Sequence, residues 1–191
     1  MKKVLTGFII LLTASAAAAA DREVALRYNQ MLREAFDEKG QGRVIPVAIE
    51  KAVETEGSMS DDGSWAVYSS DREKGNQDIY LRSMTGIALV RMTTHAARDT
   101  APSLSPDGSR IAFVSYRDDP AGDIFTARIK PADIIEDNET GILDRLAKNI
   151  SQIKTENGVI RMVKDADPVW SPDGSQIAFS SERAGEENIW I

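Results

Sequence analysis

The sequence predicts an all-β protein: a partial β-propeller of two four-stranded blades and part of a third, preceded by an N-terminal helix. Two observations support this fold class. A short turn motif recurs three times, and each copy is flanked by short runs of β-branched and aromatic residues. The first two copies lie 45 residues apart, which is a spacing typical of propeller blades.

The turn motif is Ser-Asp-Asp-Gly-Ser at 60–64 and Ser-Pro-Asp-Gly-Ser at 105–109 and 171–175. Proline fixes its own φ, aspartate accepts local backbone hydrogen bonds, and glycine takes the left-handed conformation, so the motif suits a tight hairpin turn. We therefore assign a structural role to the residues that build the three turns. They are Asp62, Gly63, Pro106, Asp107, Gly108, Pro172, Asp173 and Gly174.

Each motif is followed by two further segments typical of strands, which are Arg110–Ser115 and Asp123–Arg128 in the second copy. The first and third copies align with them position by position, although the third has one deletion before Asn188. Fourth strands are expected at 87–92 and around 143–150. The first blade then spans about 56–95, the second spans about 99–151, and the third begins near 165.

The N-terminal segments are predicted to be separate from the blades. Residues 1–20 have two lysines, an apolar run and a string of alanines, which is the pattern of a cleavable export signal. An uncleaved anchor is the alternative, but the apolar run is shorter than a bilayer span requires. Residues 21–55 contain a predicted helix at 22–37 and a strand at 44–49 that could latch a closed ring. The blades occupy 56–191.

Composition excludes several classes of function. Asp and Glu number 30 against 23 Lys and Arg, and this net charge of −7 argues against binding to nucleic acid. Cysteine is absent, which excludes disulfides and thiolate chemistry. The sequence has no nucleophile elbow, phosphate-binding loop or His-Glu-x-x-His motif, and His95 is its only histidine. We therefore expect no catalytic site, no metal, no cofactor and no membrane span after removal of the signal.

The string Pro-x-Trp-Ser-Pro-Asp-Gly-x-x-Ile-Ala-Phe-x-Ser at 168–181 resembles the repeat of TolB-like propellers, and 102–115 carries the same string with leucine for tryptophan. The resemblance implies an exported, periplasmic propeller whose partner is another cell-envelope protein or peptide. Related blades also cap serine peptidases of the prolyl oligopeptidase type. Two features depart from the family: a sizeable α/β domain before the propeller is missing, and Asp61 stands where proline is expected.

Polar residues repeated in every unit have two interpretations. Arg72, Arg117 and Arg183 each precede an acidic or amide residue by five or six positions, and they could form a ring of ligands. We favour a structural role, in which each arginine bridges the turn between neighbouring strands of its blade. Residues in variable loops are better candidates for binding a basic peptide or a calcium ion. They form a predicted acidic rim of Asp99, Asp118, Asp119, Asp165, Asp167 and Glu182.

The number of blades leads to an expectation about the whole protein. Propellers need about four to eight blades, so two blades and part of a third do not close a ring. We expect the chain to be a piece of a longer protein or to self-associate, with residues 130–164 as an insertion in the second blade. The predicted function is a periplasmic scaffold for protein–protein interaction. The alternative is the cap or gating domain of a hydrolase or lyase whose catalytic part lies elsewhere.

Overall fold

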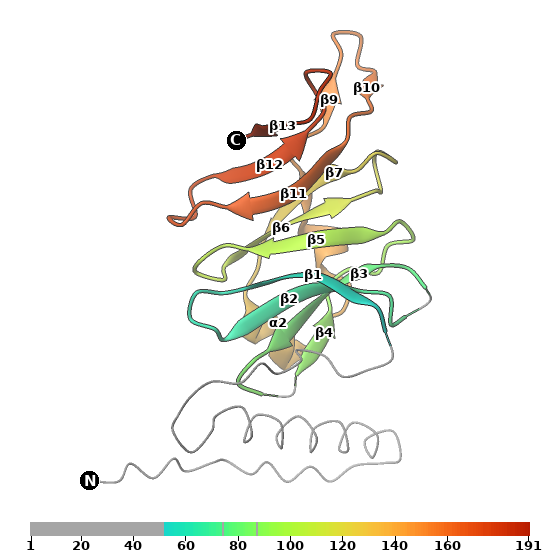
Figure 1. The fold of residues 1–191 in the computed structure, drawn as a ribbon. Coiled ribbons are helices and arrows are strands. Elements are labelled where there is room, and N and C mark those ends of the chain that lie inside the picture. Colours follow the sequence, from blue (N-terminus) through green and yellow to red (C-terminus); the bar gives the residue numbers. More distant parts are fainter. Residues whose placement is uncertain (1–51, 74, 87) are drawn as a thin grey trace, which may run out of the picture. The chain divides into compact units, whose positions relative to one another are not determined.

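The computed structural model describes residues 52–73, 75–86 and 88–191. The predicted signal at 1–20, the helix at 22–37 and the strand at 44–49 lie outside these residues. Within them, three antiparallel sheets follow one another along the chain, with four, four and three strands (Figure 1). The prediction of two complete blades and part of a third is therefore confirmed.

The first sheet has the order β1-β2-β3-β4. Its strands are β1 (Glu54–Met59), β2 (Trp65–Ser70), β3 (Asp78–Ser83) and β4 (Leu89–Arg91). The second sheet repeats this order with β5, β6, β7 and β8. Its strands are β5 (Asp99–Leu104), β6 (Arg110–Ser115), β7 (Asp123–Arg128) and β8 (Lys148–Asn149).

The third sheet has the order β11-β12-β13, and its strands are β11 (Asp165–Trp170), β12 (Ile177–Ser181) and β13 (Asn188–Trp190). Residues between β7 and β11 contain the helices α2 (Pro131–Asp137) and α3 (Ile142–Leu146) and the two-stranded hairpin of β9 (Ile153–Lys154) and β10 (Ile160–Arg161). The prediction of a strand over 143–150 is thus wrong in its first half, which is α3. Gly141 starts this helix with a φ of 68°, a conformation that glycine adopts readily.

The sheets pack face to face because each strand alternates apolar side chains between its two faces. The core between the first two sheets includes Val67 and Ile79 from one side and Ile111 and Phe113 from the other. Val114 and Ile124 then face the third sheet, where Phe179 packs against them. Each pair of neighbouring sheets thus buries its own apolar cluster, which is the arrangement expected of units that contact only their neighbours.

The three turns have the predicted structure. In the second, the Ser105 hydroxyl donates to the Asp107 carboxylate at 2.6 Å, the Ser109 amide donates to the same oxygen at 3.1 Å, and Gly108 has a φ of 67°. In the third, the Ser171 hydroxyl and then the Ser175 amide hold the pKa of Asp173 down to about 2. The repeated Ser, Asp and Gly residues therefore make the same local contacts in these turns.

Asp61, which replaces proline in the first turn, contributes a bond that proline cannot make. Its backbone N–H donates to the carbonyl oxygen of Pro106 in the next blade at 3.1 Å. Gly63 in this turn has the same φ of 67° as Gly108 and Gly174. The degenerate copy therefore keeps the geometry of the turn and gains a link between the first two blades.

Each first strand carries a β-bulge at the same place. The register shifts after Thr55, Thr100 and Ala166. The residue that follows is left-handed in all three cases, at Glu56, Ala101 and Asp167. In the first blade the Glu56 carboxylate accepts the Ala101 N–H of the second blade at 2.8 Å. The bulge therefore also forms a contact between blades.

No helix in the described part of the chain is long and apolar enough to cross a lipid bilayer.

Candidate protein-binding face

One end of the sheets, which we call the loop face, brings together two sets of residues distant in sequence. It consists of the first residues of β1, β5 and β11 together with the β2–β3, β6–β7 and β12–β13 loops. Asp99 pairs with Ser115 across β5 and β6, and Asp165 pairs with Ser181 across β11 and β12. Each strand start therefore lies beside the loop that follows the second strand of the same sheet.

A cluster built around one arginine repeats at this end of every blade. In the second blade, Arg117 donates to the Ser115 hydroxyl at 2.7 Å and to the Asp99 carboxylate at 3.1 Å. Its guanidinium also lies over the Phe125 ring, 5.1 Å from the centroid. Arg183 makes the same set of contacts with Ser181, Asp165 and Trp190 in the third blade. The cluster combines an ion pair, a hydrogen bond and a cation–π contact.

These arginines link strands within their own blade, as predicted, but they do not bind the acidic or amide residue five or six positions later. Each arginine stays within its own blade, but it reaches back to the acid at the start of the first strand, 18 residues earlier. In the first blade this acid is Glu54, 2.7 Å from Arg72. Asp78 is instead bound by Arg91 at 2.5 Å, and Asp123 is bound by Asn149 at 2.8 Å. The sequence spacing suggested the wrong pair because the partner comes from another strand of the sheet.

Three members of the predicted acidic rim are buried. Asp99 and Asp165 are 0% and 1% exposed and bind the arginines described above. Burial raises the pKa of Asp99, whereas hydrogen bonding to Ser115 and the charge of Arg117 act in the opposite direction. Asp119 is also buried, and its carboxylate accepts the backbone N–H groups of Ala121 and Val163. These carboxylates face partners inside the protein.

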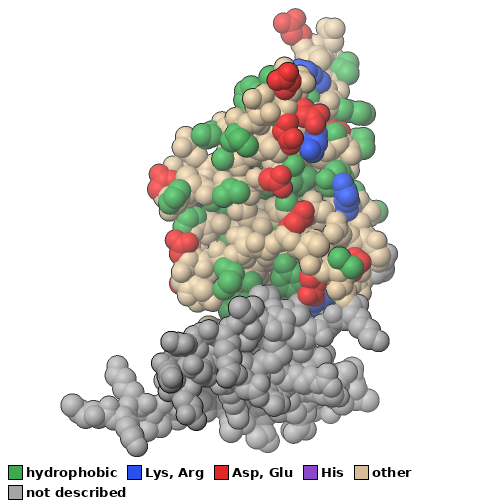
Figure 2. All heavy atoms as spheres, viewed as in Figure 1, with side chains coloured by type: hydrophobic (Ala, Val, Ile, Leu, Met, Phe, Trp, Pro, Cys, Tyr) green, Lys and Arg blue, Asp and Glu red, His purple; other side chains and the backbone are tan. Residues whose placement is uncertain are grey.

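The other three members, Asp118, Asp167 and Glu182, are exposed on the loop face. Asp118 accepts one hydrogen bond, from the Asn149 side chain at 3.2 Å. Glu182 and Asp167 both lie close enough to Lys164 to help raise its pKa, after the larger contribution of its hydrogen bond with Glu187. Figure 2 shows acidic side chains recurring from sheet to sheet on the side of the stack that it presents. The exposed carboxylates therefore offer acidic groups at this end, with the cation of Lys164 among them.

Asp123, six positions after Arg117, is a further buried carboxylate of the same region and was not among the predicted acidic rim. It is 3% exposed and receives a hydrogen bond from the neutral Asn149. Burial raises the pKa of Asp123, and the nearby charges of Asp119, Asp165 and Asp118 raise it further. The second blade thus holds an acidic group that lacks the arginine found beside Asp78 in the first blade.

An apolar hairpin projects from the loop face. Val159, Ile160 and Met162 on and around β10 are 63%, 41% and 69% exposed. The hairpin is fixed at its base, because the Val163 N–H donates to Asp119 and the Lys164 carbonyl oxygen accepts from the Glu182 N–H. Figure 1 shows β9 and β10 extending beyond the neighbouring sheet. Exposed apolar side chains in one place are typical of protein-binding sites.

Sequence reasoning placed these three residues in an insertion but did not identify the hairpin. The signal was present: Asn157-Gly158 stands between two short segments that contain β-branched residues, Ile153-Lys154-Thr155 and Val159-Ile160, and this dipeptide strongly favours a hairpin turn. The structure confirms the turn, with Gly158 at a φ of 76° and its N–H donating to the Thr155 carbonyl oxygen. The hairpin therefore adds apolar anchors to the exposed carboxylates.

The described residues contain no group of three or more His, Asp or Glu side chains arranged to hold a metal ion. His95 uses its Nδ1 atom to accept the Ala97 N–H at 3.0 Å, which is a local turn contact. The loop face is suited to recognition. Its carboxylates can pair with cations, and its projecting apolar hairpin can contact a hydrophobic surface.

The fold and this face define the protein as a β-propeller in partial, open form. A TolB homologue of Chlorobium luteolum is 36% identical over 149 residues, which cover 68% of this chain and 34% of the homologue. The solved structure of an Agrobacterium tumefaciens protein provisionally named TolB matches with a TM-score of 0.53 and 25% identity, over 75% of this chain and 44% of that one. The repeats described here are blades of the TolB-like propeller family.

A peptidase is also among the relatives. Dipeptidyl-peptidase 5 of Porphyromonas gingivalis is 28% identical over 142 residues, which cover 70% of this chain and 18% of the peptidase. No protein-family model matches the chain. The chain thus spans about a third of the length of the TolB homologue and less of the peptidase, so the activities of the whole relatives come to it only as proposals.

Proposed function

We propose that the protein is an exported propeller scaffold that binds another protein of the cell envelope through the loop face. The observation that carries this proposal is the combination on one face of exposed Asp118, Asp167 and Glu182 with the apolar hairpin at Val159 to Met162. The TolB-like family supports a scaffold role, and the signal predicted at 1–20 supports export to the periplasm.

The chemistry of the face specifies the kind of partner. Apolar side chains supply binding free energy by leaving water, and they are effective when surrounded by polar groups that exclude solvent. The carboxylates favour a partner with Lys or Arg beside its own apolar patch, and they accelerate its approach. The rigid strands below fix both groups, so little entropy is lost on binding.

The test is co-purification of tagged chain with envelope proteins after cross-linking in cells, quantified by mass spectrometry. The variant Val159→Ser with Met162→Ser, and separately Asp118→Lys with Glu182→Lys, should each reduce recovery of the same protein by about tenfold. Glu136→Lys on α2 is the matched control for charge reversal and should leave recovery unchanged. Undiminished recovery with both double variants would refute the proposal.

A second candidate function is the cap or gating domain of a hydrolase, which the peptidase relative favours. This function requires a catalytic domain on the same polypeptide, with a Gly-x-Ser-x-Gly motif and later Asp and His. The mass of the protein isolated from cells, together with labelling by a fluorophosphonate probe for active serines, distinguishes the two. A labelled, larger polypeptide supports the cap, whereas an unlabelled one that retains its envelope partner supports the scaffold.

A further inference from the structure

We propose that a pocket between α2 and α3, on the outer rim of the second blade, binds a peptide segment that carries an apolar side chain next to Lys or Arg. The pocket has a volume of about 360 Å³ and is built from the end of β7 and the two inserted helices. It belongs to the insertion between β7 and β8, and it is distinct from the loop face used in the proposed function.

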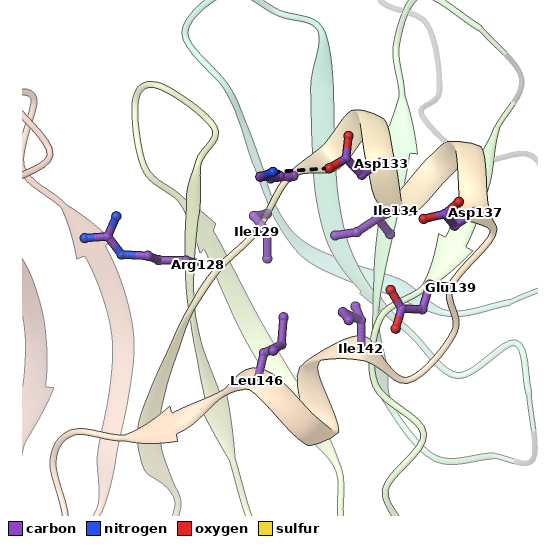
Figure 3. Close-up of a pocket in the computed structure, with 9 residues that line it drawn as sticks. Arg128, Ile129, Asp133, Ile134, Asp137, Glu139, Ile142 and Leu146 are labelled. Atoms are coloured by element: carbon purple, nitrogen blue, oxygen red, sulfur yellow. Dashed lines mark ion pairs between the residues drawn. The ribbon is translucent and has the colours of Figure 1, made fainter.

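The floor of the pocket is apolar. Ile129, Ile134 and Ile142 line it and are each about 5% exposed, while Leu146 at its mouth is 39% exposed. Figure 3 shows these four side chains converging from the connection after β7, from α2 and from α3. A space of this size lies at the lower end of the range for ligand pockets and suits one or two apolar side chains. The mouth at Leu146 leaves the rest of a peptide outside.

The charged residues that line the pocket are unevenly distributed. Lys130 pairs with Asp133 at 3.6 Å near the β7 end, and Arg128 also lies there. At the other end Asp137 and Glu139 lie near one another above Ile142 (Figure 3). Glu139 pairs with Arg145, whereas Asp137 forms no ion pair with any residue in the described part of the chain. This acidic end therefore complements a cation placed beside the apolar floor.

The pocket is held in place by contacts across two blades. The Gly141 and Leu143 N–H groups donate to the carbonyl oxygens of Arg91 and Met92 in and after β4, at 3.0 and 2.9 Å. Asp144 accepts from the backbone N–H and the hydroxyl of Thr94 and also contacts Arg117. Because α3 is fixed in this way before any ligand arrives, the pocket is preorganised and binding orders few groups.

Charge complementarity selects the occupant. The buried isoleucines exclude a fully polar ligand, because its polar groups would lose water without gaining partners. At the α2 end of the pocket Asp137 forms no ion pair in the described part of the chain, so it disfavours an acidic residue placed there by like-charge repulsion. An apolar side chain with a neighbouring Lys or Arg satisfies both ends of the site, because its apolar group fills the floor and its cation pairs with Asp137.

The experiment is methyl NMR of the full chain labelled at Ile and Leu, titrated with three capped peptides. The probe is Gly-Ser-Leu-Lys-Ser-Gly, the second peptide replaces Lys by Glu, and the third replaces Leu by Ser. The probe should produce saturable shifts at the Ile134, Ile142 and Leu146 methyl groups and none at Ile189. The Glu and Ser peptides should bind at least about fivefold more weakly.

Two exposed variants on α2 complete the test. Asp137→Lys should weaken binding of the probe by about three- to tenfold, while Glu136→Lys, which lies outside the pocket lining, should not change it. Absence of shifts at the pocket methyl groups, or equal binding of the Lys and Glu peptides, would overturn the proposal. Because neither variant touches the loop face, envelope-partner recovery that survives Asp137→Lys separates failure here from failure of the scaffold function.

Discussion

The first and second blades have the same strand order, turn and arginine cluster, but they differ at their outer edges. In the first, Asp78 is bound by Arg91 of β4; in the second, Asp123 is bound by Asn149 of β8. The first blade joins its last two strands by a short connection, whereas the second inserts α2 and α3 there. The comparison teaches that repeated residues build the blade, and that the candidate binding groups lie where the copies differ.

The largest expected effect comes from the arginine cluster, which both blades share. Arg117→Ala leaves the carboxylate of Asp99, 0% exposed, without its cation, and should reduce the free energy of unfolding by about 3–5 kcal/mol. Arg72→Ala should cost about 1–3 kcal/mol, because the side chain of Glu54 is 19% exposed and can recover water. Urea unfolding monitored by circular dichroism measures both losses. Equal losses would show that burial of the acid does not set the cost.

An intermediate effect is expected where the insertion contacts the first blade. A Cβ at Gly141 would lie 2.9 Å from Thr94 Oγ1, and the φ of +68° is itself unfavourable for alanine. Gly141→Ala should therefore destabilise the protein by about 2–3 kcal/mol. Gly158→Ala on the hairpin has a φ of +76° but open space around it, so it should cost only about 1 kcal/mol. Thermal unfolding measures both variants, and the difference between them is the cost of the close approach to Thr94. Identical melting temperatures would contradict this close approach.

The smallest effect is expected at Asp123 among the outer carboxylates, and its sign is opposite to that at Asp78 in the first blade. Asp123→Asn removes a buried charge whose partner is a neutral amide, so it should stabilise the protein at pH 7 by about 1 kcal/mol. Asp78→Asn weakens the ion pair with Arg91 and should destabilise it by about 1–3 kcal/mol. Chemical unfolding at pH 7 provides the comparison.

The pH dependence checks the cause of the Asp123 effect. Burial, with neighbouring carboxylates, raises the folded-state pKa of Asp123 above its unfolded value of about 3.9. The folded state then holds this proton more tightly, so stability is lost as pH rises from about 4 through the folded pKa. The advantage of Asp123→Asn should be absent below about pH 4 and complete at pH 7. An advantage independent of pH would point to packing instead of charge.

Much of the fold could be predicted because the relevant signals are local and repeated. The Asp107 turn, the strand after it and the Asp123 strand each follow from short stretches of sequence, and three copies confirm one another. The split of 142–150 into α3 and β8 could not be predicted, because an isolated apolar run fits either a helix or a strand. Contacts with Arg91, Met92 and Thr94, which are distant in sequence, fix α3.

The candidate site was less predictable than the fold. Asp99 and Asp118 have similar sequence contexts, in acidic loops beside strands, yet one binds Arg117 in the interior and the other is exposed. The sequence cannot distinguish them, because burial depends on which strand lies opposite. The pocket beneath α2 also depends on packing between segments distant in sequence, since Ile129 and Leu146 meet only when the insertion folds back.

The bulge after Thr55, Thr100 and Ala166 lets each first strand hold one extra residue without changing which of its later side chains face the core. Beyond the bulge, Ser103 and Leu104 still lie opposite Ala112 and Ile111, so the surplus residue Ala101 is absorbed locally. The cost is a left-handed backbone at Glu56, Ala101 and Asp167, a conformation that residues other than glycine adopt less readily. Each unit therefore tolerates a one-residue surplus at the same point of its first strand.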